Sequence, residues 1–252
     1  MLLAVDIGNT DVVLGCWNHH QWAPIWRVRS LPHENVLYYE TRLRNYFLEV
    51  RFSDVKTVVV SSVVPPLTGV FRQLLGSLFG FEPLLVTTDA YPALKVNTDR
   101  PHELGSDLFA NAVAAHTRYQ QNCVVVDFGT ALTFTTVSAA GELLGVAIAP
   151  GLRTAMKALS ANTAQLPEIP LLLPQSAIGK NTVHAMQAGI LLGYVGLVES
   201  LLSRIRAELG GECVAVATGG LSSVMEPLHP QFADVDMNLT LDGLRIIGES
   251  HM

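Results

Sequence analysis

Two short phrases of this chain combine residue types that can hold a phosphate group. The phrase Ala4-Val-Asp-Ile-Gly-Asn-Thr10 opens the sequence, and Val125-Val-Asp-Phe-Gly-Thr-Ala131 lies near its middle. In each, an apolar run ends at an Asp that can face a metal or water, and a Gly lets the backbone approach a ligand. The Thr hydroxyl and nearby N–H groups can hydrogen-bond phosphate oxygens. Two such phrases about 120 residues apart predict duplicated halves that face one nucleotide.

Each phrase supplies a candidate phosphate loop, although either loop taken alone is also consistent with a simple capped turn. Neither is a Walker-type loop, because neither leads into Gly-Lys-Ser/Thr and a helix. The only Gly-Lys pair, Gly179-Lys180, lacks the upstream glycine of that motif. The candidate phosphate ligands are Asp6, Gly8, Asn9 and Thr10 in the first loop and Asp127, Gly129 and Thr130 in the second.

A carboxylate suited to general-base catalysis lies at the start of a predicted apolar helix. Asp107 occurs in Leu104-Gly-Ser-Asp-Leu108, where a negative charge also favours the helix N-terminus. Capping the helix is one role for this residue. The other is to accept the proton of a substrate hydroxyl as it attacks a γ-phosphorus, a step worth about 10²–10⁴-fold in rate.

Two further glycine patterns suggest that a ligand ring or another helix approaches the backbone closely. Ala217-Thr-Gly-Gly220 follows a buried strand, and its consecutive glycines allow backbone to lie against a flat ring such as adenine, or to form a turn into a helix. Gly189, Gly193 and Gly196 fall on one side of a predicted helix over 182–209. Their missing side chains favour packing against another helix, either in the core or across a dimer.

Composition limits the class of protein. Of 252 residues, 49% are hydrophobic and only 15% are charged, which favours an α/β fold with sheets covered by helices. A net charge of −6 without a Lys or Arg run argues against a nucleic-acid or anionic-membrane partner. No uncharged apolar run reaches the roughly 18 residues that span a bilayer. Cys16, Cys123 and Cys213 lack framework spacing, so we expect reduced core thiols in a cytoplasmic protein.

The order of elements is similar in the two halves. Each is predicted to open with an antiparallel meander followed by alternating helix and strand, with the halves dividing into 1–118 and 119–252 and a ligand cleft between them. The first half is predicted to have strands 2–7, 12–17, 24–29 and 57–62 and helices 36–50 and 67–79. The second is predicted to have strands 123–127, 132–138, 143–148 and 213–217 and helices 152–160 and 182–209.

Taken together and in this order, the motifs resemble the type III pantothenate kinases, a branch of the actin, sugar-kinase and Hsp70-like superfamily. The resemblance runs almost end to end and is carried chiefly by Asp127-Phe-Gly-Thr-Ala131, Ile178-Gly-Lys-Asn-Thr182 and Leu239-Thr-Leu-Asp-Gly-Leu244. It implies an α/β fold of duplicated ribonuclease-H-like (actin-like ATPase) halves. Each half would be a mixed five-stranded sheet flanked by helices, with the nucleotide cleft between them.

The resemblance also implies ATP-dependent phosphorylation of pantothenate to 4′-phosphopantothenate, the first step of coenzyme A biosynthesis, by a homodimer whose active site lies near the interface. It assigns ATP phosphates to Asp6, Ile7, Gly8, Asn9, Thr10, Asp11, Val12 and Val13, with help from Thr130, and the glycine phrases described above add Gly129, Gly219 and Gly220 as nucleotide contacts. It assigns Mg²⁺ to Asp6 and a monovalent cation, K⁺ or NH₄⁺, to Asp127. It makes Asp107 the catalytic base and assigns pantothenate to Gly105, Ser106, Asp107, Leu108 and Thr182.

Two positions depart from the family pattern. Leu108 stands where the family has an Arg, and Thr98 where a substrate-side Tyr is common. Loss of an Arg that hydrogen-bonds a carboxylate removes about 1.5–3 kcal/mol of binding free energy. Two alternatives therefore stay open, a kinase of another small hydroxy acid and a catalytically silent nucleotide-binding regulatory protein. Arg100, Arg153 and Lys157 are candidates for a replacement cation.

Overall fold

The computed structural model describes residues 1–49 and 54–252, so Val50 of the predicted 36–50 helix lies outside the described residues. The chain forms two compact units. The first contains Met1–Ala114 together with Asn238–Met252, and the second contains Ala115–Met237. The first boundary lies four residues before the predicted division at 118. The segment after Met237 differs from the prediction, since it packs with the first unit and not with the second half.

The sheet of the first unit is mixed and five-stranded, as predicted. Its strand order is β3-β2-β1-β4-β5, with antiparallel pairing among the first three strands and parallel pairing of β1 with β4 and of β4 with β5. β-Branched residues dominate β4, which is typical of a strand buried on both faces. The strands are β1 (Leu2–Ile7), β2 (Asp11–Trp17), β3 (Trp26–Arg29), β4 (Thr57–Ser62) and β5 (Leu84–Leu85).

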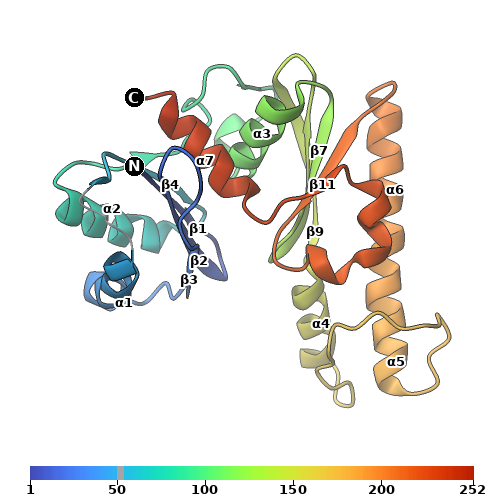
Figure 1. Ribbon diagram of the computed structural model, residues 1–252. Helices are drawn as coiled ribbons and strands as arrows, with labels where there is room; N and C mark the ends of the chain where they lie inside the picture. The colour runs from blue at the N-terminus through green and yellow to red at the C-terminus, as the bar shows by residue number, and fades with distance from the viewer. Residues whose placement is uncertain (50–53) are drawn as a thin grey trace. The chain divides into compact units, whose positions relative to one another are not determined.

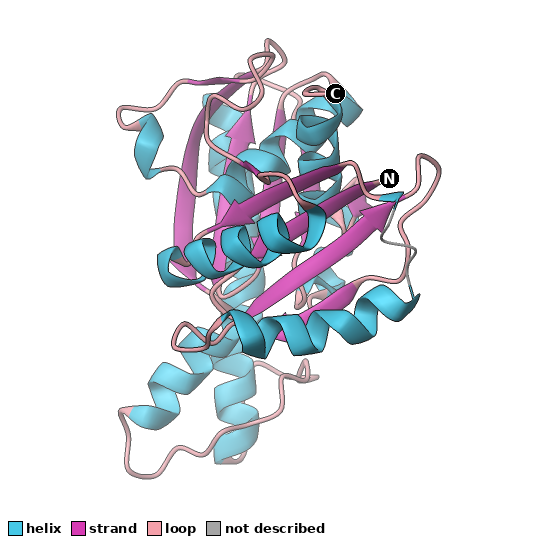
Figure 2. Cartoon of the chain, turned by 90° about the vertical axis from the view of Figure 1, so that its left-hand side faces the viewer, coloured by secondary structure: helices cyan, strands magenta, loops and turns pink. Residues whose placement is uncertain are grey.

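Helices cover both faces of this sheet (Figures 1 and 2). On one face, Tyr39 and Leu43 of α1 and Phe71 of α2 pack against the apolar residues of β1, β2 and β4. Helix α2 begins at Pro65, two residues before the predicted start, because proline suits the first turn of a helix, where its missing N–H has no partner to lose. The helices of this unit are α1 (Val36–Glu49), α2 (Pro65–Phe79) and α7 (Leu239–Glu249), with the short 3₁₀ helix η2 (Pro101–Glu103) and strand β6 (Lys95–Val96).

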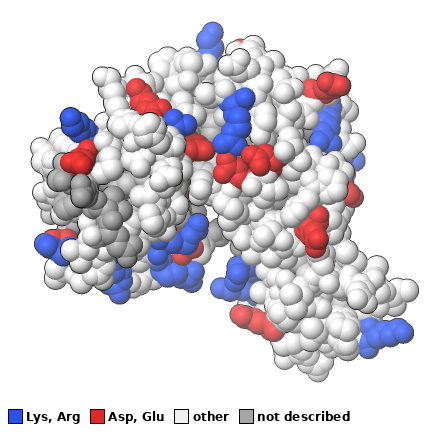
Figure 3. All heavy atoms as spheres, in the orientation of Figure 1, with Lys and Arg blue, Asp and Glu red and all other residues white. Residues whose placement is uncertain are grey.

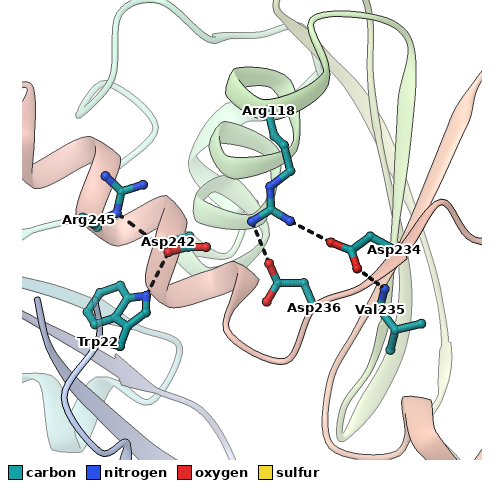
Figure 4. A network of polar contacts seen from close by, with 7 residues as sticks. All are labelled: Trp22, Arg118, Asp234, Val235, Asp236, Asp242 and Arg245. Atoms are coloured by element: carbon teal, nitrogen blue, oxygen red, sulfur yellow. Dashed lines mark hydrogen bonds and ion pairs between the residues drawn. The ribbon is translucent and has the colours of Figure 1, made fainter. Parts of the chain in front are cut away.

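Helix α7 covers the opposite face of the first sheet. Gly248 lies so close to Leu2 and Val59 that a side chain there would overlap both. At the start of the same helix, the Trp22 indole N–H donates to Asp242 Oδ1 at 2.9 Å (Figure 4). The helix therefore joins the first unit through both its apolar face and a specific polar contact.

The second unit is built around a mixed sheet in which its strands follow the order β11-β10-β7-β8-β9. Strands β7, β8 and β9 form an antiparallel meander, and β10 lies parallel to β7. Between β10 and β11 the chain forms two short 3₁₀ helices, η4 (Ser222–Val224) and η5 (Glu226–Gln231). The strands are β7 (Cys123–Phe128), β8 (Ala131–Val137), β9 (Glu142–Pro150), β10 (Val214–Thr218) and β11 (Asp234–Val235).

One long helical stretch packs on this sheet. Val198 and Leu202 are fully buried in a core with Val124 and Val126 of β7. The stretch Thr182–Glu208 is long and apolar enough to cross a membrane by length and composition, but 44% of its most apolar window is buried inside the fold, as in a core helix. Its segments are α5 (Thr182–Gln187), a π-helical turn η3 (Ala188–Leu192) and α6 (Gly193–Glu208); α4 (Leu152–Ala161) precedes them.

An ion-pair cluster joins the last turn of α3 (Ser106–Tyr119) to the edge of the second sheet. The Arg118 guanidinium contacts Asp234 at 3.1 Å and Asp236 at 2.7 Å (Figure 4). Both carboxylates lie at β11, so a single planar cation fixes the edge strand to the helix.

Charges of both signs are mixed on one face of the molecule (Figure 3), and two of the three predicted core thiols are buried, whereas Cys213 is half-buried. On the face shown in Figure 3, basic and acidic side chains lie close together and no extended basic patch is seen. All three cysteines are free thiols. Burial raises the pKa of Cys16 to about 11 and that of Cys123 to about 12, so neither is a nucleophile at neutral pH.

Candidate active site

The first turn, Gly8–Thr10, joins β1 to β2 in the first unit. The Gly8 N–H donates to the Asp11 carbonyl at 3.0 Å and closes the turn, while Asn9 and Thr10 are exposed. The side chains of Ile7 and Val12 are fully buried in the apolar core. Of the predicted phosphate segment, these two residues can therefore offer a ligand only their backbone.

Ser30 fixes the shape of this turn from the end of β3. Its N–H donates to the Thr10 carbonyl at 2.9 Å, and its hydroxyl donates to the Gly8 carbonyl at 2.5 Å. Both bonds use backbone carbonyls, so they fix the backbone of this exposed turn. Sequence analysis did not single out Ser30, because a serine after a strand is a common loop residue.

Asp107 lies near the carboxyl ends of the central strands β1 and β4. The Ser106 hydroxyl accepts from the Ser62 N–H at 2.9 Å and lies 3.0 Å from the Ser61 hydroxyl. In the parallel register of β1 and β4, Ser61 is directly beside Asp6. Hydrogen bonds to β4 thus hold the first residues of α3 at the same strand ends that carry the first turn.

The immediate surroundings of Asp107 favour its neutral form. Burial raises the pKa of the carboxyl, and hydrogen bonds from the backbone N–H groups of Leu108 and Asp107 itself partly oppose the rise. The Leu108 N–H donates to Asp107 Oδ1 at 2.8 Å, which fixes the carboxylate at the helix start. Gly105 leaves the space that the same oxygen occupies. A carboxyl with a raised pKa is a stronger base when ionised and suits proton abstraction near neutral pH.

The second turn, Gly129–Thr130, joins β7 to β8 in the second unit and is held by the start of α4. The Gly151 N–H donates to the Thr130 carbonyl at 3.0 Å, and the Thr154 hydroxyl donates to the same oxygen at 2.7 Å. A side chain at Gly151 would overlap the carbonyls of both turn residues. The turn is therefore packed directly against helix α4.

The glycines after β10 lie against this second turn. Gly219 has a positive φ of 87°, and a Cβ there would overlap Asp127 Oδ1 and the backbone of Phe128. Thr218 is beside Asp127 in the parallel register of β10 and β7. The structure thus brings together Asp127, the second turn and the Gly219-Gly220 segment, which sequence analysis had predicted as separate parts of a nucleotide site.

Thr182 is the first residue of α5 and lines a groove of about 810 Å³ in the second unit. Asn181 caps the helix by accepting from the His184 N–H at 2.9 Å. Apolar residues of α4 and α5, including Leu159 and Met186, form the rest of the wall beside Lys180. The groove thus combines an apolar surface with a few polar groups at one helix start.

Three glycines of the long helix, Gly189, Gly193 and Gly196, are exposed. A Cβ added at Gly189, Gly193 or Gly196 would meet no other described residue within 4 Å. Packing in the core, one of the two predicted roles, is therefore wrong for this face. A dimer contact remains a prediction.

Both candidate cation positions offer oxygen donors. Asp6 and Asp127 are the penultimate residues of β1 and β7, directly before the two turns, and both carboxylates belong to half-buried residues. Among residues 1–49 and 54–252, no group of three or more His, Cys, Asp or Glu side chains forms a metal cluster. Mg²⁺ beside a nucleotide takes one or two carboxylates with phosphate and water oxygens, so the donors at Asp6 fit it.

Comparison with known proteins gives one family. A family model described as type III pantothenate kinase matches residues 2–204. A protein named type III pantothenate kinase from Roseiflexus sp. (strain RS-1) is 43% identical over 99% of this chain and 98% of its own length.

Solved structures show the same fold at low identity. A putative Baf family transcriptional activator from Campylobacter jejuni matches with a TM-score of 0.62 and 19% identity over 99% of this chain and 98% of that one. An inorganic polyphosphate/ATP-glucomannokinase from Arthrobacter sp. strain KM matches with a TM-score of 0.53 and 13% sequence identity. The match covers 100% of this chain and 99% of that one. The predicted actin-like α/β fold is confirmed.

Proposed function

The chain belongs to the type III pantothenate kinase family, and from this premise we propose that it phosphorylates the primary hydroxyl of pantothenate with ATP. The product is 4′-phosphopantothenate, on the route to coenzyme A. The observation that carries this proposal is the position of Asp107 at the strand ends of β1 and β4, beside the first turn. The relatives' shared name does not favour the regulatory alternative.

Asp107 acts as the general base. Its carboxylate accepts the proton of the attacking hydroxyl, and the backbone N–H of Leu108 keeps it oriented. The rise in pKa caused by burial makes this proton transfer more favourable than for an exposed Asp. Gly105 and Ser106 form the adjoining substrate loop, because both lie in the short segment that Ser61 and Ser62 anchor.

Each glycine turn binds phosphate oxygens in its own unit. In the first, Asn9 and Thr10 are exposed residues, and their N–H groups with the Thr10 hydroxyl are the proposed donors to a phosphate. In the second, Thr130 is exposed while its carbonyl is held by Gly151 and Thr154. We assign the flat Gly219-Gly220 segment to the adenine end of the nucleotide, since it has no bulky side chain.

Two cations are part of this proposal. Asp6 would hold Mg²⁺, and Asp127 would hold K⁺ or NH₄⁺. Bound there, these ions neutralise charge on phosphate oxygens.

The substrate carboxylate lacks the family's arginine as a partner, because Leu108 stands at that position. Leu108 supplies no charge, and Arg100 is paired with Glu103 at 2.9 Å, which offsets its charge. We infer that pantothenate binds through the Gly105–Leu108 loop, with a higher KM than a bidentate arginine would give. A kinase of another small hydroxy acid is the alternative outcome of the test below.

The active protein is a cytoplasmic homodimer in this proposal. The exposed glycine face of α6 and the apolar groove beside Thr182 support a second copy as the neighbour. Ile178 and Leu172 are 79% and 64% exposed, which adds apolar surface in the same unit. Mass measured by light scattering for the wild type and for Gly193→Glu tests this, since a charge on the glycine face should give monomers.

The deciding experiment is detection of 4′-phosphopantothenate by mass spectrometry after incubation with Mg·ATP and pantothenate, in K⁺ and in Na⁺. We expect product from the wild type and a loss of about 10²–10⁴-fold in rate for Asp107→Asn. Higher turnover in K⁺ supports the site at Asp127. Folded protein that binds ATP but forms no product would overturn the proposal.

A further inference from the structure

Three charged side chains form a row beside the first turn. Arg27 and Arg29 of β3 lie 3.7 Å from opposite carboxylate oxygens of Asp11, the first residue of β2. Trp26 and Val28, which alternate with them, pack into the apolar core. The alternation of a strand therefore places both arginines on the sheet face away from that core. The proposed kinase reaction gives them no role so far.

The strand register places this row next to the phosphate turn. Arg29 is directly opposite Asp11, and Arg27 is opposite Val13, which is itself opposite Asp6 on β1. Asp6, Arg27 and Arg29 thus lie on one face, with Arg27 two strands from Asp6, or about 10 Å between α-carbons. Ser30, the next residue after Arg29, is the one that bonds the turn carbonyls.

The charges of the row do not cancel. Two guanidinium groups face one carboxylate, and both separations exceed the length of a charge-assisted hydrogen bond. The side chains of Arg27 and Arg29 are 50% and 69% exposed, whereas that of Asp11 is only 22% exposed. Asp11 therefore orients the two cations and leaves N–H donors facing outward.

An anionic Asp11 is a poor phosphate ligand by itself, because like charges repel. It can instead orient the two arginines, whose guanidinium groups form paired hydrogen bonds to phosphate. We propose that Arg27 and Arg29 bind the terminal phosphate of the ATP held by the first turn, and that Asp11 positions them. This inference rests on the proposed function for the identity of the nucleotide.

The test measures nucleotide binding without pantothenate. Calorimetry would give the dissociation constants of Mg·ATP, Mg·ADP and AMP for the wild type, Arg27→Met, Arg29→Met and the double variant. We expect the double variant to bind ATP about 10- to 100-fold more weakly, ADP only a few-fold more weakly, and AMP equally well. Arg27→Lys and Arg29→Lys should recover part of the ATP affinity, because they keep the charge.

Arg44→Met is the matched control. Arg44 is an exposed arginine of the same unit, paired with Glu40 on α1 and remote in sequence from the turn. It should leave all three constants unchanged. Asp11→Asn, which keeps both arginines but loosens them, should reduce ATP affinity less than the double variant does.

ATP affinity within twofold of wild type in the double variant would overturn the inference. So would an equal loss for ATP, ADP and AMP, which would indicate a damaged turn. If the wild type binds ATP selectively through the arginines but phosphorylates no pantothenate, the proposed function is wrong and this inference stands. A wild type that binds no ATP overturns both.

Discussion

The two Asp-x-Gly turns share a sequence phrase but are supported in different ways. The first is surrounded by side chains, with Ser30 bonded to its carbonyls and Asp11 paired with two arginines. The second is surrounded by backbone, with Gly151 and Gly219 packed directly on it. The same sequence phrase is therefore supported by charged and polar side chains in the first unit and by closely packed backbone in the second.

The strongest test of this contrast is to substitute alanine for one glycine at each turn. Gly219→Ala places a Cβ against Asp127 and 2.7 Å from the Phe128 backbone, at a positive φ. We expect a loss of about 3 kcal/mol in the free energy of unfolding, from strain and overlap together. At Gly8→Ala the added Cβ lies 3.2 Å from one carbonyl oxygen, and we expect about 1 kcal/mol. Urea denaturation measures both, and equal losses would contradict the contrast.

The second test uses pH and concerns the first unit. Because burial raises the pKa of Asp107, its proton binds more tightly than on a free Asp, and the base is lost at a higher pH. Below that pKa, kcat/KM should fall about tenfold per pH unit. A profile whose acid limb lies at or below the ordinary Asp range would refute this.

Ionisation of Asp107 should lower the free energy of unfolding, although the proposed activity requires it. A raised pKa in the folded state means that ionised Asp107 destabilises the fold, at pH values above that pKa. Asp107→Asn should therefore unfold at higher urea concentration than the wild type at pH 7, although it is nearly inactive. Lower stability of this variant would indicate that the carboxylate itself holds the helix start.

A matched pair of hydroxyl deletions tests how each turn is fixed. Ser30 is buried, so Ser30→Ala leaves the Gly8 carbonyl without its donor and should cost about 1–3 kcal/mol. Thr154 is exposed, so after Thr154→Val water can replace its bond to Thr130, at a cost of about 0.5 kcal/mol. Thermal unfolding of both variants gives the comparison, and the reverse order would refute it.

A further test concerns the C-terminal helix of the first unit. Trp22→Phe removes the hydrogen bond to Asp242 and should cost about 1 kcal/mol. Amide hydrogen exchange should then rise in α7 and in the β2–β3 loop, and stay unchanged in the second unit. Asp242→Asn keeps an acceptor for the indole and should show a smaller rise. Faster exchange throughout the chain would mean that the contact supports more than the first unit.

Sequence analysis predicted most elements because their signals are local. The β-branched run of β4 and the meanders around each Asp-x-Gly phrase matched the observed strands within about three residues. The predicted start of α2 at residue 67 was two residues late, because the helix already begins at Pro65, and proline suits the first turn of a helix.

Contacts between distant segments were not predictable in the same way. The pattern of Leu239-Thr-Leu-Asp-Gly-Leu244 is that of an amphipathic helix, but it carries no information on which sheet receives it. The Arg27 and Arg29 pair did leave a signal, two charges alternating with Trp26 and Val28 on an edge strand. Recognising it required the register that places them opposite Asp11.

The division of the chain also bears on the order of folding during synthesis. The second unit is one continuous segment, Ala115–Met237, whereas the first needs Asn238–Met252 to cover Leu2 and Val59. The ribosome releases residues in sequence order, so the later-synthesised unit can finish folding before the earlier one. Until α7 has been translated, the nascent chain keeps an apolar sheet face open to chaperones and proteases, and the first unit, which carries Asp107, stays incomplete.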